Sequence, residues 1–151
     1  MPAWVLLLAL TATATPPSAA TAPAAPAALP VTSLELQGHT VLVEVADSAG
    51  ARAQGLMHRP FLGADQGMLF VYPSADMRAF WMANTTIPLS IAFIGADGAI
   101  VSIRDMQPLD RGHTWSGFPA QYALEVNQGW FDQHGIQPGV QVHGLPGPSR
   151  E

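Results

Sequence analysis

The stretch that decides the fold is "LSIAFIGADGAIVSIRDM", residues 89–106. Two runs of similar length, both rich in apolar residues, flank a short turn that contains Asp97 and Gly98. An Asp-Gly pair suits the positive backbone dihedrals of a tight hairpin turn. The stretch therefore predicts two antiparallel strands joined directly to one another.

Other short runs on both sides of this hairpin also have the pattern of strands. In "HTVLVEVAD", residues 39–47, every second residue is a valine, which is the period of a strand with one buried face. "GMLFVY", residues 67–72, is a compact apolar run that ends at Pro73. Three further strands are predicted over "MRAFWMA" (77–83), "QYALEV" (121–126) and "PGVQVHG" (138–144).

Two short helices are predicted between these strands. Asp47 and Ser48 can cap a helix over "AGARAQGLM", residues 49–57, with Gly55 as its stop. Asn127 can cap about one turn of a second helix in "QGWFDQHG", the segment that follows it. Many short strands with tight turns and two small helices predict a mainly β single domain, with the architecture of an antiparallel sandwich or barrel.

The N-terminal part of the chain differs in composition from the rest. Residues 1–20 begin with the apolar run "WVLLLAL", which predicts a signal peptide and is too short to span a bilayer. An Ala/Pro-rich linker is predicted over 21–32, the β domain over 33–144 and a flexible tail over 145–151. We therefore expect a periplasmic or secreted protein with no membrane span after cleavage; the alternative is an uncleaved N-terminal anchor.

The amino-acid composition excludes or disfavours several classes of function. The 151 residues include 48% hydrophobic and 11% charged residues, which is enough apolar material for a core. The six cationic side chains are scattered arginines, whereas a nucleic-acid partner requires clustered cations. The chain has no cysteine, which excludes disulfides and thiol chemistry.

Five blocks of sequence occur in a distinctive order: "ARAQGLMHRPFL", "GMLFVY", "FWMANTTIPLSIAFIGADGAIVSI", "MQP" and "YALEVNQGWFDQHGIQPGVQV". In this order and spacing the chain resembles the DUF192 family of uncharacterised bacterial and archaeal domains, from about Leu34 to Val142. The resemblance implies a mainly β fold with short helices, often behind a signal peptide. It implies no reaction.

The chain departs from the pattern of that family at two positions. Family members commonly carry a lysine after Trp-Met and an aspartate after Ile-Pro-Leu, where this chain has Ala83 and Ser90. The absence of both the lysine and the aspartate suits a structural ion pair that was replaced as a unit, because loss of only one of them would leave the other charge buried without a partner. A charge-based reaction at these positions is therefore disfavoured.

A polar patch beside aromatic residues predicts a ligand site. Arg59 could hold an anion with its two-pronged guanidinium, and exposed indoles could stack on a sugar or an apolar ligand. The alternative is that Arg59 has a purely structural role and forms an ion pair with an acid such as Glu125. The segment Asn84–Pro88 could be only a well-capped bend. The predicted ligand-binding residues are Arg59, Trp81, Asn84, Thr85 and Trp115.

The sequence favours a non-catalytic exported domain that binds a small molecule, a glycan or an envelope protein, without cofactor, metal or catalytic residues. The first alternative is a hydrolase-type enzyme with Arg59 as anion holder and Asp110, His113 or Glu125 as acid and base. No G-x-S-x-G motif is present to support it. The second alternative is copper(I) binding, in which the sulfur of at least one of three methionines would converge with a histidine. These methionines are Met57, Met68 and Met82.

Overall fold

The structure is a computed structural model that describes residues 27–151. The predicted signal peptide and the first part of the linker lie outside the described residues. The strands within 27–151 are β1 (Val31–Leu36), β2 (His39–Ala46), β3 (Gln66–Asp76), β4 (Ala79–Phe80), β5 (Leu89–Ile94), β6 (Ile100–Met106), β7 (Thr114–Trp115), β8 (Ala120–Asn127) and β9 (Val142–His143). The helices are α1 (Ala49–Gln54) and α2 (Trp130–Gln133). No helix among the described residues is long and apolar enough to cross a membrane.

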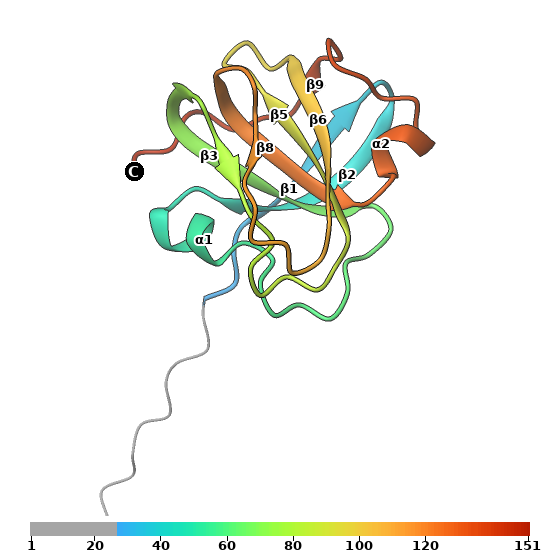
Figure 1. Cartoon of the computed structure of the whole chain (residues 1–151). Helices are drawn as coiled ribbons and strands as arrows, with labels where there is room; N and C mark the ends of the chain where they lie inside the picture. The colour runs from blue at the N-terminus through green and yellow to red at the C-terminus, as the bar shows by residue number, and fades with distance from the viewer. Residues whose placement is uncertain (1–26) are drawn as a thin grey trace, which may run out of the picture.

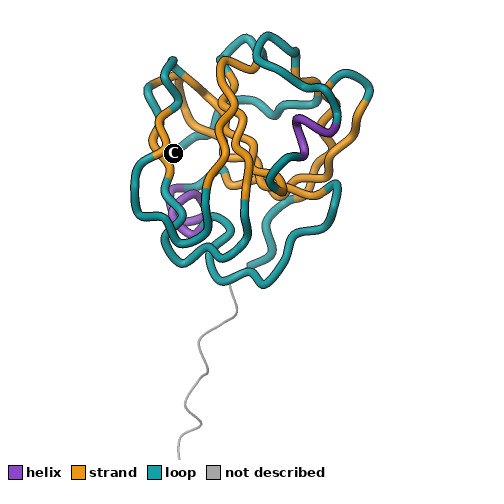
Figure 2. Tube along the Cα trace, turned by 45° about the vertical axis from the view of Figure 1, so that its right-hand side comes forward, coloured by secondary structure: helices purple, strands orange, loops and turns teal. Residues whose placement is uncertain are grey.

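The fold is mainly β and is built on one curled sheet (Figure 1). Seven strands follow the order β6-β5-β8-β3-β2-β1-β9, and β4 pairs with β7 in a separate two-stranded sheet. The predicted hairpin is confirmed as β5 and β6, which pair antiparallel on either side of the Asp97-Gly98 turn. The tube in Figure 2 shows this sheet curling round on itself, with loops at both its upper and its lower end.

One strand pair departs from the antiparallel prediction. β2 and β3 pair in parallel, with Val43 opposite Gly67. Parallel neighbours need a crossover connection, and here α1 and the loop after it make that crossover. The prediction of mainly antiparallel pairing is therefore confirmed except at this one pair, and the crossover places α1 against the sheet.

The two helices are confirmed, but the second is capped differently from the prediction. α1 begins after Ser48, whose side chain accepts the backbone N–H of Ala51 at 3.2 Å. α2 begins after Gly129, which has a left-handed conformation, and the amide of Asn127 donates instead to the carbonyls of Leu62 and Gly63. Asn127 therefore holds a distant loop and does not cap α2.

Several predicted strand boundaries are wrong. β3 continues through Pro73 to Asp76, with a shift of register after Val71. The predicted strands over 77–83 and 138–144 shrink to the two-residue strands β4 and β9. β1 begins at Val31, inside the predicted linker.

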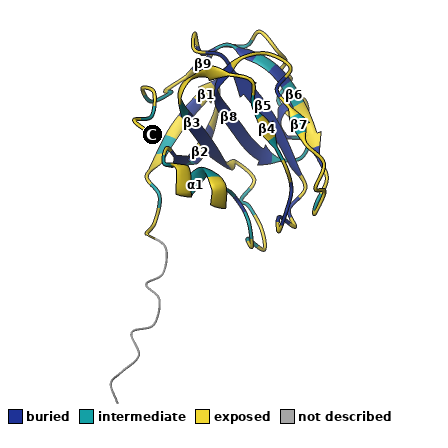
Figure 3. Ribbon diagram, turned by 60° about the vertical axis from the view of Figure 1, so that its left-hand side comes forward, coloured by how far each residue is buried: buried dark blue, intermediate teal, exposed yellow. Residues whose placement is uncertain are grey.

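Both faces of the central strands are buried. β8 is buried along nearly all of its length, as the dark blue ribbon of Figure 3 shows. Leu124 and Val126 pack in one cluster with β1, β2 and α2, whereas Ala123 packs on the opposite face, in a second cluster with Leu56 and Phe70. Strand residues of odd number in β8 therefore point toward α1 and the loop 81–88.

The C-terminal segment lies along the outside of this fold. The predicted flexible tail over 145–151 makes four hydrogen bonds to the body of the domain, one of them from Arg52 to the hydroxyl of Ser149 at 3.5 Å. Tyr122 donates to the carbonyl of Pro146 at 2.8 Å, and the N–H of Ser149 donates to the carbonyl of Tyr72 at 3.3 Å. Arg52 donates to the carbonyl of Glu151 at 2.8 Å.

Candidate functional site

A buried carboxyl lies at the centre of the sheet. Glu125 occupies the middle of β8, opposite Met68 of β3 and Ile91 of β5, and only 4% of its surface is exposed. Among the described residues, none makes a hydrogen bond or an ion pair with its carboxyl. Burial raises the pKa of Glu125 to about 8, because the ionised form loses its hydration. At neutral pH the group is therefore mostly protonated.

This carboxyl lines a cavity of about 120 Å³ between the sheet and α1. The aromatic side chains of Phe70, Phe80 and Trp81 form part of its wall, and Phe70 meets Phe80 edge to face at 4.9 Å between ring centroids. Among the described residues, every side-chain nitrogen or oxygen atom that is fully buried has a hydrogen-bond partner. The carboxyl oxygens of Glu125 have no such partner, so they are not fully buried and stay accessible from the cavity. The other lining residues are Arg52, Ala53, Gln54, Gly55, Leu56, Met57, Tyr72, Ala79, Met82 and Thr85.

Two arginines lie near one end of the cavity, but their charges are already engaged. The guanidinium of Arg52 is 5.0 Å from the ring centroid of Tyr72, and that of Arg78 is 3.8 Å from it. Burial raises the pKa of Tyr72, and the two arginines oppose this effect. Arg52 donates to the carbonyls of Asp47 and Val71, both at 2.9 Å, so it serves chiefly to hold the backbone around the cavity.

The bend at residues 82–85 forms another part of the wall. Asn84 has φ +54°, the left-handed conformation expected of an asparagine in a bend, and its side chain is exposed. The buried hydroxyl of Thr85 donates to the carbonyl of Ala83 at 3.1 Å. The N–H of Met82 donates to the carbonyl of Asp110 at 2.8 Å, so the bend is fixed to the neighbouring loop.

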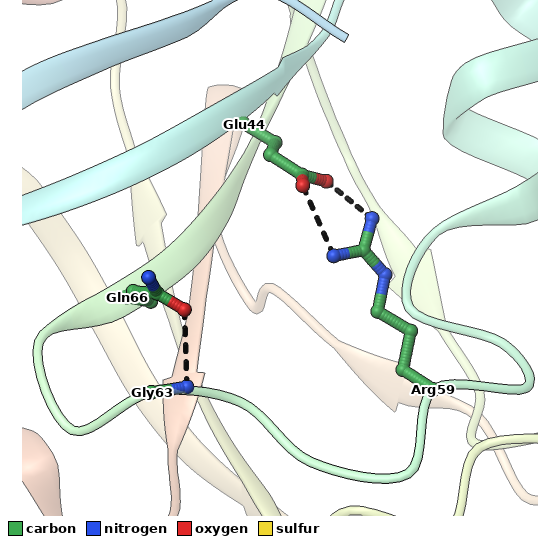
Figure 4. A network of polar contacts seen from close by, with 4 residues as sticks. All are labelled: Glu44, Arg59, Gly63 and Gln66. Atoms are coloured by element: carbon green, nitrogen blue, oxygen red, sulfur yellow. Dashed lines mark hydrogen bonds and ion pairs between the residues drawn. The ribbon is translucent and has the colours of Figure 1, made fainter. Parts of the chain in front are cut away.

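Arg59 lies outside this cavity. Its guanidinium makes a two-pronged ion pair with Glu44 of β2, and both side chains are about one third exposed (Figure 4). In the same view Gln66 accepts the backbone N–H of Gly63 at 3.2 Å. The alternative prediction that Arg59 pairs with a structural acid is confirmed. The acid is Glu44, so the suggested partner Glu125 is wrong. The backbone of Arg59 still contacts the bend, because Thr86 donates to its carbonyl at 3.3 Å.

The two exposed tryptophans meet on the surface through a histidine. The ring of His113 stacks on that of Trp81, with 6.4 Å between the ring centroids, and meets the ring of Trp115 edge to face, with 6.0 Å between the centroids. Trp81 is 50% exposed and Trp115 is 55% exposed. Trp81 belongs both to this aromatic surface and to the cavity wall, whereas Trp115 belongs only to the surface.

The five predicted ligand residues therefore divide into groups. Trp81 and Thr85 line the cavity, and Asn84 forms the exposed turn beside them. Trp115 lies across His113 from Trp81, and Arg59 makes its ion pair elsewhere. The structure does not bring all five side chains around one cleft.

The residues of the two alternative functions do not converge either. Asp110 is exposed and accepts the N–H of Gly112 in its own loop, and neither it nor His113 lines the cavity of Glu125. Met57 and Met82 do line it, but no histidine is among the described residues that line this cavity. Among the described residues, no three His, Asp or Glu side chains form a group able to hold a metal ion.

Sequence reasoning considered Glu125 as a structural acid or a catalytic group, but left it out of the ligand site. The available signal was a charged residue in the middle of "YALEV", because a fully buried glutamate is rare unless it is paired. Tyr72 and Phe80 gave no such signal, since aromatic residues in apolar strands are normally core. Only the crossover through α1 shows that these strands border a cavity.

A family model places the chain among known sequences. The model of DUF192, described as Uncharacterized ACR, matches residues 32–144. The chain therefore belongs to the DUF192 family. No curated protein matches it.

Two solved structures resemble this fold over most of their length. A protein from Sinorhizobium meliloti, provisionally described as a transcription regulator, is 31% identical, with a TM-score of 0.76 over 79% of this chain and 97% of that one. A protein of unknown function from Novosphingobium aromaticivorans is 34% identical, with a TM-score of 0.74 over 88% of this chain and 99% of that one.

Proposed function

We propose that this DUF192 member binds a small molecule, without catalysis, in the cavity over Glu125. One observation carries the proposal: a buried carboxyl that has no partner among residues 27–151 faces an open cavity. An unpaired buried acid lowers stability, and a neutral side chain of similar shape would avoid that cost. Strongly perturbed acids in clefts are accordingly frequent at functional sites.

The wall of the cavity supports a specific ligand site. It combines aromatic and aliphatic side chains with the polar side chains of Arg52, Gln54, Tyr72, Thr85 and Glu125, which can orient a ligand. The cavity is small, so the ligand or the bound part of it is small as well.

The experiment for this proposal uses NMR of the protein with ¹³C-labelled methionine methyl groups. A panel of small amines, alcohols, carboxylic acids and monosaccharides is added, and the signals of Met57 and Met82 report on the cavity wall. We expect at least one compound to shift these two signals and not that of Met77, which lies outside the cavity. Arg59→Ala is the matched control and should show the same shifts, since the Arg59 guanidinium binds Glu44. A panel that leaves Met57 and Met82 unmoved contradicts the proposal.

A second candidate is glycan binding on the surface of Trp81, His113 and Trp115. The exposed rings of this surface favour it, because sugars stack on exposed indoles. Titration with cellobiose and chitobiose, followed by tryptophan fluorescence, tests the idea. Binding that is lost in Trp115→Ala supports it, and unchanged fluorescence with both sugars removes it.

We further propose that the protein acts in the periplasm or outside the cell, on a small molecule, glycan or envelope partner. The apolar N-terminal run and the Ala/Pro-rich linker support this location. For the fold we infer an open barrel rather than a sandwich. The bridge between Ala99 and Gln141, which links the start of β6 to the segment before β9, supports that inference.

A further inference from the structure

We propose that the ligand of this cavity is a small organic ammonium ion, with its charged nitrogen at the carboxylate of Glu125 and its alkyl part against the aromatic wall. This inference rests on the proposed function and adds the chemical class of the ligand.

The cavity offers acceptors to a ligand. The carboxyl of Glu125 has no partner among the described residues, and ionised it only accepts hydrogen bonds. The hydroxyl of Thr85 donates its hydrogen bond to the carbonyl of Ala83, so toward the cavity it can only accept. Met57 and Met82 add thioether sulfurs, which are weak acceptors. A ligand that donates several N–H bonds suits this set.

The charged donors near the cavity are largely engaged by backbone carbonyls. Nη1 of Arg52 donates to the carbonyls of Asp47 and Val71, and its Nη2 donates to that of Glu151. Arg78 donates from Nε to the carbonyl of Ala120 at 3.1 Å and from Nη2 to that of Ser74 at 2.5 Å. An anionic ligand would face Glu125 and would reach only the guanidinium N–H groups that these carbonyls leave open.

The aromatic wall favours an ammonium ion over a neutral donor. Phe70, Phe80 and Trp81 line the cavity, and the face of an aromatic ring attracts a cation. The ring of Tyr72 also lines it but already contacts the guanidiniums of Arg52 and Arg78. A carboxylate in a poorly hydrated site also attracts a cation more strongly than it does in water. The volume of about 120 Å³ is slightly below the roughly 150 Å³ of an apolar cavity that accepts benzene, so a ligand of a few non-hydrogen atoms fits.

Binding of an ammonium ion is coupled to loss of the Glu125 proton. Burial holds the pKa of Glu125 at about 8, and the titratable and charged groups that face the cavity from other elements are Arg52 of α1, Tyr72 of β3 and, against the Tyr72 ring, Arg78. A cation stabilises the ionised carboxyl, so each bound ammonium releases a proton to solution at pH 7. Affinity for an ammonium ion therefore rises with pH until Glu125 is ionised, whereas affinity for a neutral molecule does not.

The test titrates the full mature chain with n-propylammonium and with 1-propanol, its neutral analogue of similar size, at pH 6, 7, 8 and 9. The methyl signals of Met57 and Met82 report the dissociation constant. For n-propylammonium we expect affinity to rise about tenfold from pH 6 to pH 7 and less than about twofold from pH 8 to pH 9, following ionisation of Glu125. For 1-propanol we expect no such rise.

Two variants keep the test decisive. Glu125→Gln has nearly the same shape, and we expect it to lose at least about tenfold in affinity for n-propylammonium at pH 8, the scale of one lost charge-assisted contact, together with the pH dependence. Trp81→Leu, at the half-exposed rim, should weaken n-propylammonium more than 1-propanol, because only the cation gains from the ring face.

The outcomes separate this inference from the function on which it rests. If 1-propanol shifts Met57 and Met82 while n-propylammonium does not, the cavity is a binding site and the ammonium class is wrong. If n-propylammonium binds equally at every pH, or equally to Glu125→Gln, the assignment to Glu125 is wrong. If neither compound shifts the two signals, the ammonium inference fails, and the wider panel of amines, alcohols, acids and sugars then decides the proposed function.

Discussion

Glu125 and Arg59 show how differently two charged residues can be accommodated in one small domain. The Arg59 guanidinium stays partly in water and shares its charge with Glu44, so its presence needs no ligand. Glu125 is buried and unpaired among the described residues, and it lowers stability whenever it must ionise. At the scale of single residues, Glu125 is therefore the side chain whose presence calls for a functional explanation.

The stability of the protein should fall with pH because of Glu125. Its pKa in the folded protein, about 8, lies above the ordinary value of 4.5, so between these two pH values the folded protein keeps a proton that the unfolded chain loses. The stability is therefore highest below pH 4.5 and falls as the pH rises to about 8. Within this window the free energy of unfolding should decrease by about 1.4 kcal/mol per pH unit from this group alone. Urea denaturation of the wild type and of Glu125→Gln at several pH values measures the difference. A wild type and variant with parallel pH profiles would contradict the burial of this charge.

The ion pair between Arg59 and Glu44 should contribute little. Both side chains are about one third exposed, and pairs of this kind stabilise proteins by less than about 1 kcal/mol. Arg59→Ala should therefore lower the free energy of unfolding by less than about 1 kcal/mol and leave binding in the cavity unchanged. A loss of ligand affinity in this variant would show that Arg59 belongs to the binding site and would contradict its assignment to a structural ion pair.

At the scale of elements, the cavity exists because β3 lies between β2 and β8 while α1 crosses over the sheet. Gly67 makes the contact between β3 and β8 possible, because a Cβ at this position would lie 2.4 Å from the carbonyl oxygen of Glu125. That distance is far inside van der Waals contact, and the obstacle is backbone, which cannot move without disturbing strand pairing. The position of Glu125 is thus set by a glycine on the neighbouring strand.

Gly67→Ala should destabilise the protein by about 2 kcal/mol or more, the range for overpacking in a core. Gly50→Ala is the matched control: nothing lies within 4 Å of its added Cβ, and alanine favours the helix α1 by up to about 1 kcal/mol. Thermal unfolding of both variants checks the pair. If the two substitutions have the same effect, strand β3 does not approach β8 as closely as described.

The sequence predicted the elements that local chemistry determines. The hairpin of β5 and β6 followed from the Asp-Gly turn, and α1 followed from the Ser48 cap and Gly55. The parallel pairing of β2 with β3 was not predicted, because nothing within either strand specifies its neighbour. The cavity was missed for the same reason, since its walls come from α1, β3, β4, β8 and the bend at Thr85.

At the scale of the whole molecule, the tail and α1 are connected through Arg52. Its guanidinium reaches Val71 of β3 and Glu151 at the end of the chain, so the last residues are attached to the helix that borders the cavity. The opposite end of the chain carries the predicted signal peptide and linker. We describe a single β domain, and we propose that its N-terminal segment directs export and that its folded part binds a ligand.

Export is checked on the full chain with a C-terminal tag, expressed in a Gram-negative bacterium. The apolar run before the Ala/Pro-rich segment should direct the protein across the inner membrane and then be removed. We expect the tagged protein in the periplasmic fraction or the medium, with its new N-terminus after Ala14 or Ala20. Tagged protein that stays in the cytoplasm and begins at Met1 contradicts this account.

The most direct test of the central claim follows the carboxyl carbon of Glu125 by ¹³C NMR as a function of pH, with and without n-propylammonium. We predict a pKa near 8 in the free protein, because burial opposes ionisation, and a lower value when the probe is bound. A pKa near the ordinary 4.5 in the free protein, unmoved by the probe, would show that Glu125 is neither buried without a partner nor part of a binding site.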